Sequence, residues 1–170
     1  MNRSRFALLA AGVAALVALA QLVLGPSGAT AAPPVVQNVR VQLSGVHEVP
    51  ENVHGNGDRG VAEVSFDPSN DQICWQVLEL RLLDGEALPH AGHIHIAPRN
   101  VAGPIVVHFF GTGDGVAAPT SYPTPRVCRP VDGALLDQIL ASPGEYYVNL
   151  HNATHPSGVV RDQLKGPVSQ

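Results

Sequence analysis

Positive charge is scarce in this sequence. Its 170 residues include 10 Lys and Arg against 14 Asp and Glu, which gives a formal net charge of −4 at pH 7. A chain that repels phosphate is poorly suited to nucleic acid, because such binding depends largely on neutralising backbone phosphates. We therefore expect no nucleic-acid partner.

Aromatic residues are also few, at 5% of the chain, whereas glycine and proline number 17 and 15. A core built from such a sequence consists mainly of small aliphatic side chains, and many turns join the elements around it. This composition favours an all-β fold. We predict a single antiparallel β-sandwich or Greek-key-like barrel with one short helix, after an N-terminal signal peptide.

The sequence lacks the motifs of catalysis by its own side chains. It contains no Gly-x-Ser-x-Gly nucleophile elbow, and none of its glycine spacings makes a phosphate-binding loop. The carboxylates are scattered through expected turns, and Glu48, Glu63 and Glu79 form no acid/base pair. Any chemistry would therefore depend on a bound metal.

What the sequence does contain begins with a long apolar run. Arg3 and Arg5 precede residues 6–24, which carry no charge, and Ala29-Thr30-Ala31 places small residues where a signal peptidase reads. We expect residues 1–31 to be a secretory signal peptide and the protein to be secreted or extracytoplasmic. The alternative is an uncleaved membrane anchor, since the run is close to the roughly 18 residues of a spanning helix. If the signal peptide is cleaved, we expect no membrane span in the mature chain.

Cysteine is limited to Cys74 and Cys128. Export places both in an oxidising compartment where thiols tend to pair, so we predict one disulfide. The absence of a Cys-x-x-Cys motif disfavours the alternative, a pair of thiolate metal ligands. Cys128 falls in the proline-rich segment 122–130, where we expect little regular structure. The disulfide would fasten this segment to the strand that contains Cys74.

Short stretches of alternating polar and apolar residues predict the strands. They are expected over residues 37–43, 61–66, 72–80, around His93, 105–110, 145–151 and 159–164. The single helix is expected over residues 133–141, where leucine and isoleucine recur at helical spacing and Asp132 can serve as the N-cap.

The strongest candidate for a functional site is the stretch Ala91-Gly92-His93-Ile94-His95-Ile96. Side chains alternate along a strand, so His93 and His95 share one face while the isoleucines share the other. By the same rule Tyr147, Asn149 and His151 share a face further on. If the two strands are neighbours, three imidazoles converge. We therefore predict a metal site formed by His93, His95 and His151, with copper or zinc as the cation.

The alternative is that these histidines are structural, with His151 capping the loop that leads to His155. The other histidines are candidate fourth ligands (His47, His90 and His155), a solvated loop residue (His54) and a residue packed in its strand (His108). Arg161 and Asn149 are expected to satisfy loop backbone groups rather than to meet a substrate. Because imidazole must be deprotonated to bind a metal, we expect affinity to be lost as pH falls through about 6.

Several motifs together resemble the CHRD domain family, first described in chordin and common in exported bacterial proteins. The matching segments, in order, are Leu43-Ser44-Gly45-Val46-His47-Glu48-Val49-Pro50, Gly92-His93-Ile94-His95, Gly103-Pro104-Ile105-Val106-Val107, Tyr146-Tyr147-Val148-Asn149-Leu150-His151 and Pro156-Ser157-Gly158-Val159-Val160-Arg161-Asp162-Gln163-Leu164. The resemblance covers residues 36–166 and identifies them as one CHRD domain. Glu51 and Asp162 depart from the family pattern, which usually has proline and glycine there.

The resemblance implies a non-catalytic extracytoplasmic binding module, whose partner would be an unknown extracellular protein or a metal ion. The His-x-His strand is also similar to the copper-binding strand of copper/zinc superoxide dismutases, so one alternative is a dismutase-like redox metalloprotein. Against it, only His108 lies between His95 and His151, so the zinc half of that pattern is missing. The other alternative is a protein-interaction module with structural histidines.

Overall fold

The computed structural model describes residues 36–50, 57–83, 85–111 and 116–165. The predicted signal peptide over residues 1–31 lies outside these ranges, as do Glu51 and His54. Within these ranges, no helix is both long and apolar enough to cross a membrane.

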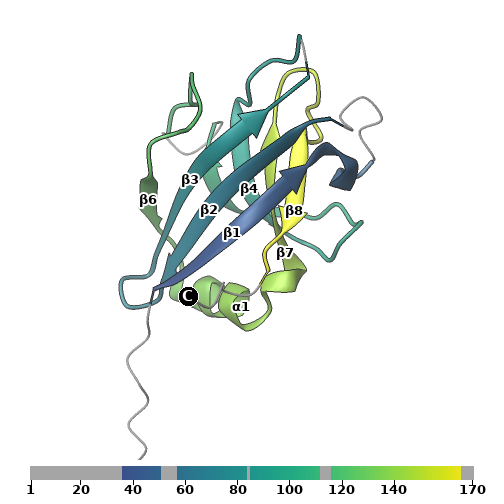
Figure 1. Cartoon of the computed structure of the whole chain (residues 1–170). Coiled ribbons are helices and arrows are strands. Elements are labelled where there is room, and N and C mark those ends of the chain that lie inside the picture. The colour runs from purple at the N-terminus through teal and green to yellow at the C-terminus, as the bar shows by residue number, and fades with distance from the viewer. Residues whose placement is uncertain (1–35, 51–56, 84, 112–115, 166–170) are drawn as a thin grey trace, which may run out of the picture. The chain divides into compact units, whose positions relative to one another are not determined.

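The described chain forms one antiparallel sheet that curls around a single core (Figure 1). The strands are β1 (Gln37–Ser44), β2 (Arg59–Asp67), β3 (Gln72–Arg81), β4 (Ala91–Ile96), β5 (Ile105–Phe110), β6 (Val127–Pro130), β7 (Tyr146–His151) and β8 (Val160–Gln163). Their order in the sheet is β5-β4-β7-β8-β1-β2-β3-β6. The all-β antiparallel prediction is confirmed, and the structure gives it the form of one curled sheet, half a barrel.

The core lies inside the curl, where the apolar residues of the alternating strands meet. In β2 and β3, the predicted hairpin, Val64 lies opposite Trp75, and both are buried. The Trp75 ring stacks on the ring of Phe109 in β5, with centroids 4.9 Å apart. Because β3 and β5 are far apart in the strand order, this stack joins two distant parts of the sheet across the interior.

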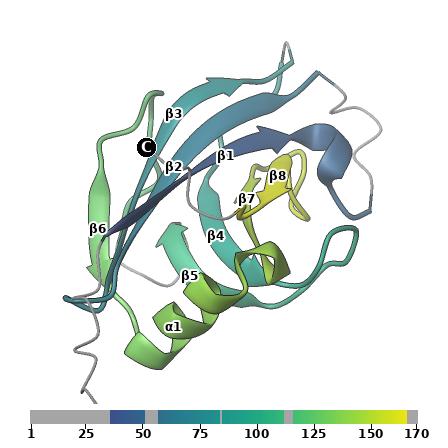
Figure 2. The ribbon, with the colours of Figure 1, turned by 60° about the horizontal axis from the view of Figure 1, so that its bottom comes forward.

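One α-helix, α1 (Gly133–Ala141), packs against one end of the curled sheet (Figure 2). As predicted, Asp132 is its N-cap, with the carboxylate accepting a hydrogen bond of 3.0 Å from the Leu135 N–H. Leu136 and Ile139 are fully buried in the core. Two short 3₁₀ helices, η1 (Gly45–His47) and η2 (Pro143–Glu145), complete the regular structure of these ranges.

The prediction that segment 122–130 lacks regular structure is wrong for its last four residues. They form β6, which pairs with β3 at the edge of the sheet, where a strand tolerates proline. Cys128 lies directly opposite Cys74, and their sulfur atoms are at disulfide distance, 2.02 Å, as the sequence predicted. Thr124 adds two hydrogen bonds to the backbone of Val77, which fix the chain leading into β6.

Candidate metal centre

The face of β4 and β7 that points away from the core is polar although it is buried. Strand pairing places His93 opposite Asn149 and His95 opposite Tyr147, with His151 opposite Ala91. The two strands are therefore neighbours, as the predicted site requires. We call His93, His95, Tyr147, Asn149 and His151 the polar face; each of them is at most 8% exposed.

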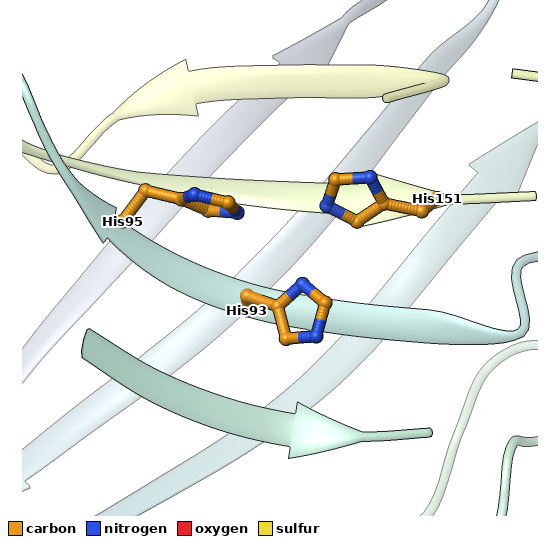
Figure 3. A group of neighbouring side chains, drawn as sticks. All are labelled: His93, His95 and His151. Carbon is orange, nitrogen blue, oxygen red and sulfur yellow. The ribbon is translucent and has the colours of Figure 1, made fainter. Parts of the chain in front are cut away.

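The three predicted histidines come together on the polar face. Figure 3 shows their rings on the same side of β4 and β7, pointing toward one another. Their ring centroids lie 5.0 to 5.6 Å apart. One ring nitrogen from each lies within 4.8 Å of the other two. This grouping makes the three rings a candidate set of metal ligands.

Two backbone carbonyls determine which ring nitrogen of His95 and of His151 carries the proton. Nδ1 of His95 lies 2.9 Å from the Gly103 oxygen, and Nδ1 of His151 lies 3.1 Å from the Pro156 oxygen. A carbonyl oxygen only accepts, so both Nδ1 atoms donate and both Nε2 atoms of the neutral rings keep a lone pair. Neither Nε2 atom has a hydrogen-bond partner within the described ranges, nor does either ring nitrogen of His93. Unprotonated, oriented imidazole nitrogens are the form that binds a metal.

The surroundings of the three rings keep them neutral. Burial first, and then the neighbouring imidazoles, lower the pKa of His93 to about 3. Burial also lowers the pKa of His151 to about 4, against the opposing hydrogen bond to Pro156. The pKa of His95 is lowered by burial first and then by the positive charge of Arg161. The site therefore needs no deprotonation step near neutral pH to accept a cation.

Gly103 holds the loop between β4 and β5 against the polar face. Its carbonyl accepts from His95, and its N–H donates to the hydroxyl of Tyr147 at 3.1 Å. A side chain at this position would overlap the carbonyl oxygen of Ile96, so the close approach requires glycine. One residue thus fixes the orientation of a candidate ligand and of its neighbour.

Tyr147 and Arg161 support His95 from the side of β8. The rings of Tyr147 and His95 are stacked, with centroids 4.8 Å apart and planes 6° apart. The Arg161 guanidinium carbon lies 3.6 Å from the centre of the Tyr147 ring, a cation–π contact. As expected from the sequence, Arg161 donates to a loop carbonyl, that of Val101, at 3.1 Å.

Glu48 is a buried polar residue that sequence analysis did not single out for this site. Its side chain is 4% exposed and accepts a hydrogen bond of 3.3 Å from the Asn149 amide, which also lies 3.5 Å from the Ser157 carbonyl. Burial raises the pKa of Glu48 to about 8, against the opposing effects of Arg161 and Asn149. The carboxyl group is therefore protonated at pH 7. Its position in a loop gave no signal of this.

The three-histidine group includes none of the candidate fourth ligands. His47 faces Asp162, with 3.6 Å between Nδ1 and Oδ1, and His90 is exposed. His155 belongs to a second group of ligand atoms with Asp58 and Glu86. Sequence reasoning missed that group, because its members come from three separate loops.

His108 lies in β5 opposite His93, as expected for a residue packed in its strand. It is half-buried, and the ring centroids of His93 and His108 are 4.9 Å apart in an edge-on arrangement. It therefore forms part of the wall around His93.

Comparison with known proteins gives one match. The model of the CHRD domain matches residues 39–164. No curated protein and no solved structure matches the chain. The match runs from β1 through the end of β8 and includes all three histidines of the polar face, so this chain belongs to the CHRD domain family.

Proposed function

We propose that this protein is an extracytoplasmic, non-catalytic CHRD module that binds copper or zinc through His93, His95 and His151. The observation that carries the proposal is the set of four buried ring nitrogens without hydrogen-bond partners in the described ranges. They belong to three rings, and one nitrogen of each ring lies within 4.8 Å of one nitrogen of each of the other two.

The main alternative, a set of structural histidines, accounts poorly for these atoms. A structural histidine in a buried site normally has its ring nitrogens hydrogen-bonded. Each buried polar group without a partner costs about 1 to 3 kcal/mol, and four of them on one face would be a large penalty. His151 does cap its loop, through Nδ1 and Pro156, but this bond leaves Nε2 directed elsewhere. Metal coordination would give the Nε2 atom of His151 the partner that the loop cap does not provide.

The donor set favours copper or zinc. Three neutral imidazoles carry no charge to neutralise a hard cation such as Ca²⁺ or Mg²⁺, which prefer oxygen ligands. Imidazole suits zinc and copper, and a carbonyl bonded to the opposite ring nitrogen is the usual partner of a ligating histidine. The carbonyls of Gly103 and Pro156 fill that position for His95 and His151.

Metal analysis of protein purified without a His tag tests this proposal. After loading with zinc or copper and desalting, we expect the variant His93→Ala with His95→Ala to hold about one equivalent less metal than the native chain. The matched control, His47→Ala, removes a histidine that faces Asp162 outside the group and should hold as much metal as the native chain. Equal metal content in both variants would contradict the proposal.

Two further measurements address the remaining parts of the proposal. A dismutase assay on copper-loaded protein should give activity no greater than that of free copper, since we propose binding without turnover.

Mass spectrometry of the protein recovered outside the cytoplasm should give the mass of a chain that begins at Ala32. A mass that includes residues 1–31 would indicate an uncleaved anchor instead.

A further inference from the structure

Three loops that carry no part of the three-histidine group meet at a second cluster of ligand atoms. Asp58 lies just before β2, Glu86 follows β3, and His155 lies in the loop after β7. One potential ligand atom from each lies within 4.8 Å of the other two. The residues are 28 and 69 positions apart along the chain, so the fold, and not local sequence, brings them together.

Asp58 is the member that points to a ligand. Its side chain is fully buried, and Oδ1 accepts a hydrogen bond of 2.7 Å from the Leu83 N–H. The second oxygen, Oδ2, is buried and has no hydrogen-bond partner among the described residues. The same ranges contain no ion pair of Asp58 with a lysine or arginine. A buried carboxylate with an unpaired oxygen is costly unless a cation compensates it.

The other two members are held in place by the loop between β7 and β8. Nε2 of His155 lies 2.9 Å from Oε1 of Glu86, and Asn152 donates to Oε2 of Glu86 at 3.0 Å. The backbone N–H of His155 in turn donates to Oδ1 of Asn152 at 2.7 Å. The side chains of His155 and Glu86 are 14% and 12% exposed, so an ion can reach them from solvent.

We propose that Asp58, Glu86 and His155 form a second cation site, which binds a divalent metal of the zinc class. Two carboxylates and one imidazole supply the mixed oxygen and nitrogen ligands that zinc accepts, and the charge of the metal matches that of the carboxylates. This site therefore differs from the three-histidine group, whose ligands are all neutral nitrogens. The proposal does not depend on metal binding at the first site.

The second site would also act on the first through the loop over residues 152–158. This loop supplies His155 to the second site and the Pro156 carbonyl that orients His151 in the first. A cation bound by Asp58, Glu86 and His155 would fasten the loop and hold that carbonyl in position.

Zinc binding in a background without the first site tests the proposal. The full chain carrying His93→Ala and His95→Ala should still bind about one zinc, measured by equilibrium dialysis with elemental analysis. Adding Asp58→Asn should weaken that binding about 100-fold, because the amide keeps an acceptor for the Leu83 N–H but replaces Oδ2 with a non-ligand. The matched control is Asp137→Asn, which removes a carboxylate from the exposed side of α1 and should change nothing.

Two outcomes would overturn the second site. One is a background variant that binds no zinc above a blank, and the other is an Asp58→Asn variant that binds as well as the Asp137→Asn control. Near-UV circular dichroism of Trp75, the single tryptophan, reports whether each variant is folded. If the background variant does not fold, Asp58→Asn in the native chain should remove one equivalent of zinc, and full retention would overturn the proposal. The first site is judged separately, by the metal lost when only its own histidines are replaced.

Discussion

The two faces of β4 and β7 are built on the same backbone and are nearly equally buried, yet they differ in what their side chains need. On the inner face, Ile94, Val148 and Leu150 are fully buried and satisfied by apolar contact alone. On the polar face, His93 and His151 are 6% and 8% exposed and have ring nitrogens without hydrogen-bond partners among the described residues. Burial by itself therefore does not distinguish a structural residue from a functional one. The distinguishing property is whether the buried polar atoms are paired.

The largest effect is expected from a change on the inner face. Ile94→Ala removes a fully buried side chain and leaves a cavity, so it should lower the free energy of unfolding by about 2 to 5 kcal/mol. Denaturant titration of the metal-free protein measures this loss. Under conditions in which the variant is folded, it should still bind zinc, because the ligands lie on the other face. Loss of zinc binding in folded Ile94→Ala would break the separation between the two faces.

The neighbouring change His93→Ala should give the opposite result. Saturating zinc, at about 100 times its dissociation constant, should stabilise the native chain by about 3 kcal/mol. At the same zinc concentration the variant should be stabilised by at most about 1.4 kcal/mol, because loss of one of the three ligands should lower the zinc affinity at least tenfold. Thermal unfolding with and without zinc gives the comparison. A variant stabilised as much as the native chain would show that His93 is not a ligand.

A protonated Glu48 gives the polar face its own pH dependence. Because burial raises its pKa from 4.5 to about 8, the folded state binds a proton that the unfolded state has lost between these values. This contribution to stability is fully present below pH 4.5 and is lost as pH rises through about 8. Between pH 6 and 7 the native chain should thus lose up to about 1.4 kcal/mol relative to Glu48→Gln, which does not titrate. Denaturant titrations of both proteins at both pH values measure this difference, and the histidine contributions cancel because both proteins contain the same histidines. An equal change in the free energy of unfolding of the two proteins from pH 6 to 7 would contradict the raised pKa.

A substitution at Gly103 tests whether the loop between β4 and β5 contributes to zinc affinity by positioning the ligands. Gly103→Ala would force the loop away from Ile96 and so displace the carbonyl that orients His95. We expect zinc affinity to fall about 10- to 100-fold, as for other changes to the groups that orient metal ligands. Gly144→Ala is the matched control, because a side chain there meets no atom within 4 Å. Equal affinities for the two variants would show that the loop does not position the site.

The sequence predicts the polar face better than it predicts what covers that face. Period-two alternation placed His93 and His95 on one side and Ile94 on the other, and the same rule grouped Tyr147 with His151. The β4–β7 pairing was an assumption, because alternation does not identify a strand's neighbour. The strand β6 was missed, since the prolines of segment 122–130 argued for a loop and the edge position of the strand was unknown.

The groups that complete the site had no signal in the sequence. The carbonyls of Gly103 and Pro156 are backbone atoms, and any residue would offer the same oxygen. Asp58 and Glu86 meet His155 only through the folding of three loops, and nothing in their local sequence indicates a ligand. Local patterns thus specify which face a residue takes, whereas long-range contacts decide whether its polar atoms find partners.

The smallest effect is expected from a fall in pH, and here the structure and the sequence alone predict different zinc affinities. An unperturbed histidine site would lose its metal as pH falls through about 6, the value expected from the sequence. Burial lowers the pKa of His93 to about 3 and that of His151 to about 4, so protons compete for these nitrogens only at lower pH. Zinc affinity, measured by calorimetry in the Asp58→Asn variant to isolate the first site, should therefore change less than about threefold from pH 7.5 to 5. A loss centred near pH 6 would mean that the rings are solvated, and the buried polar face would then not be the binding site.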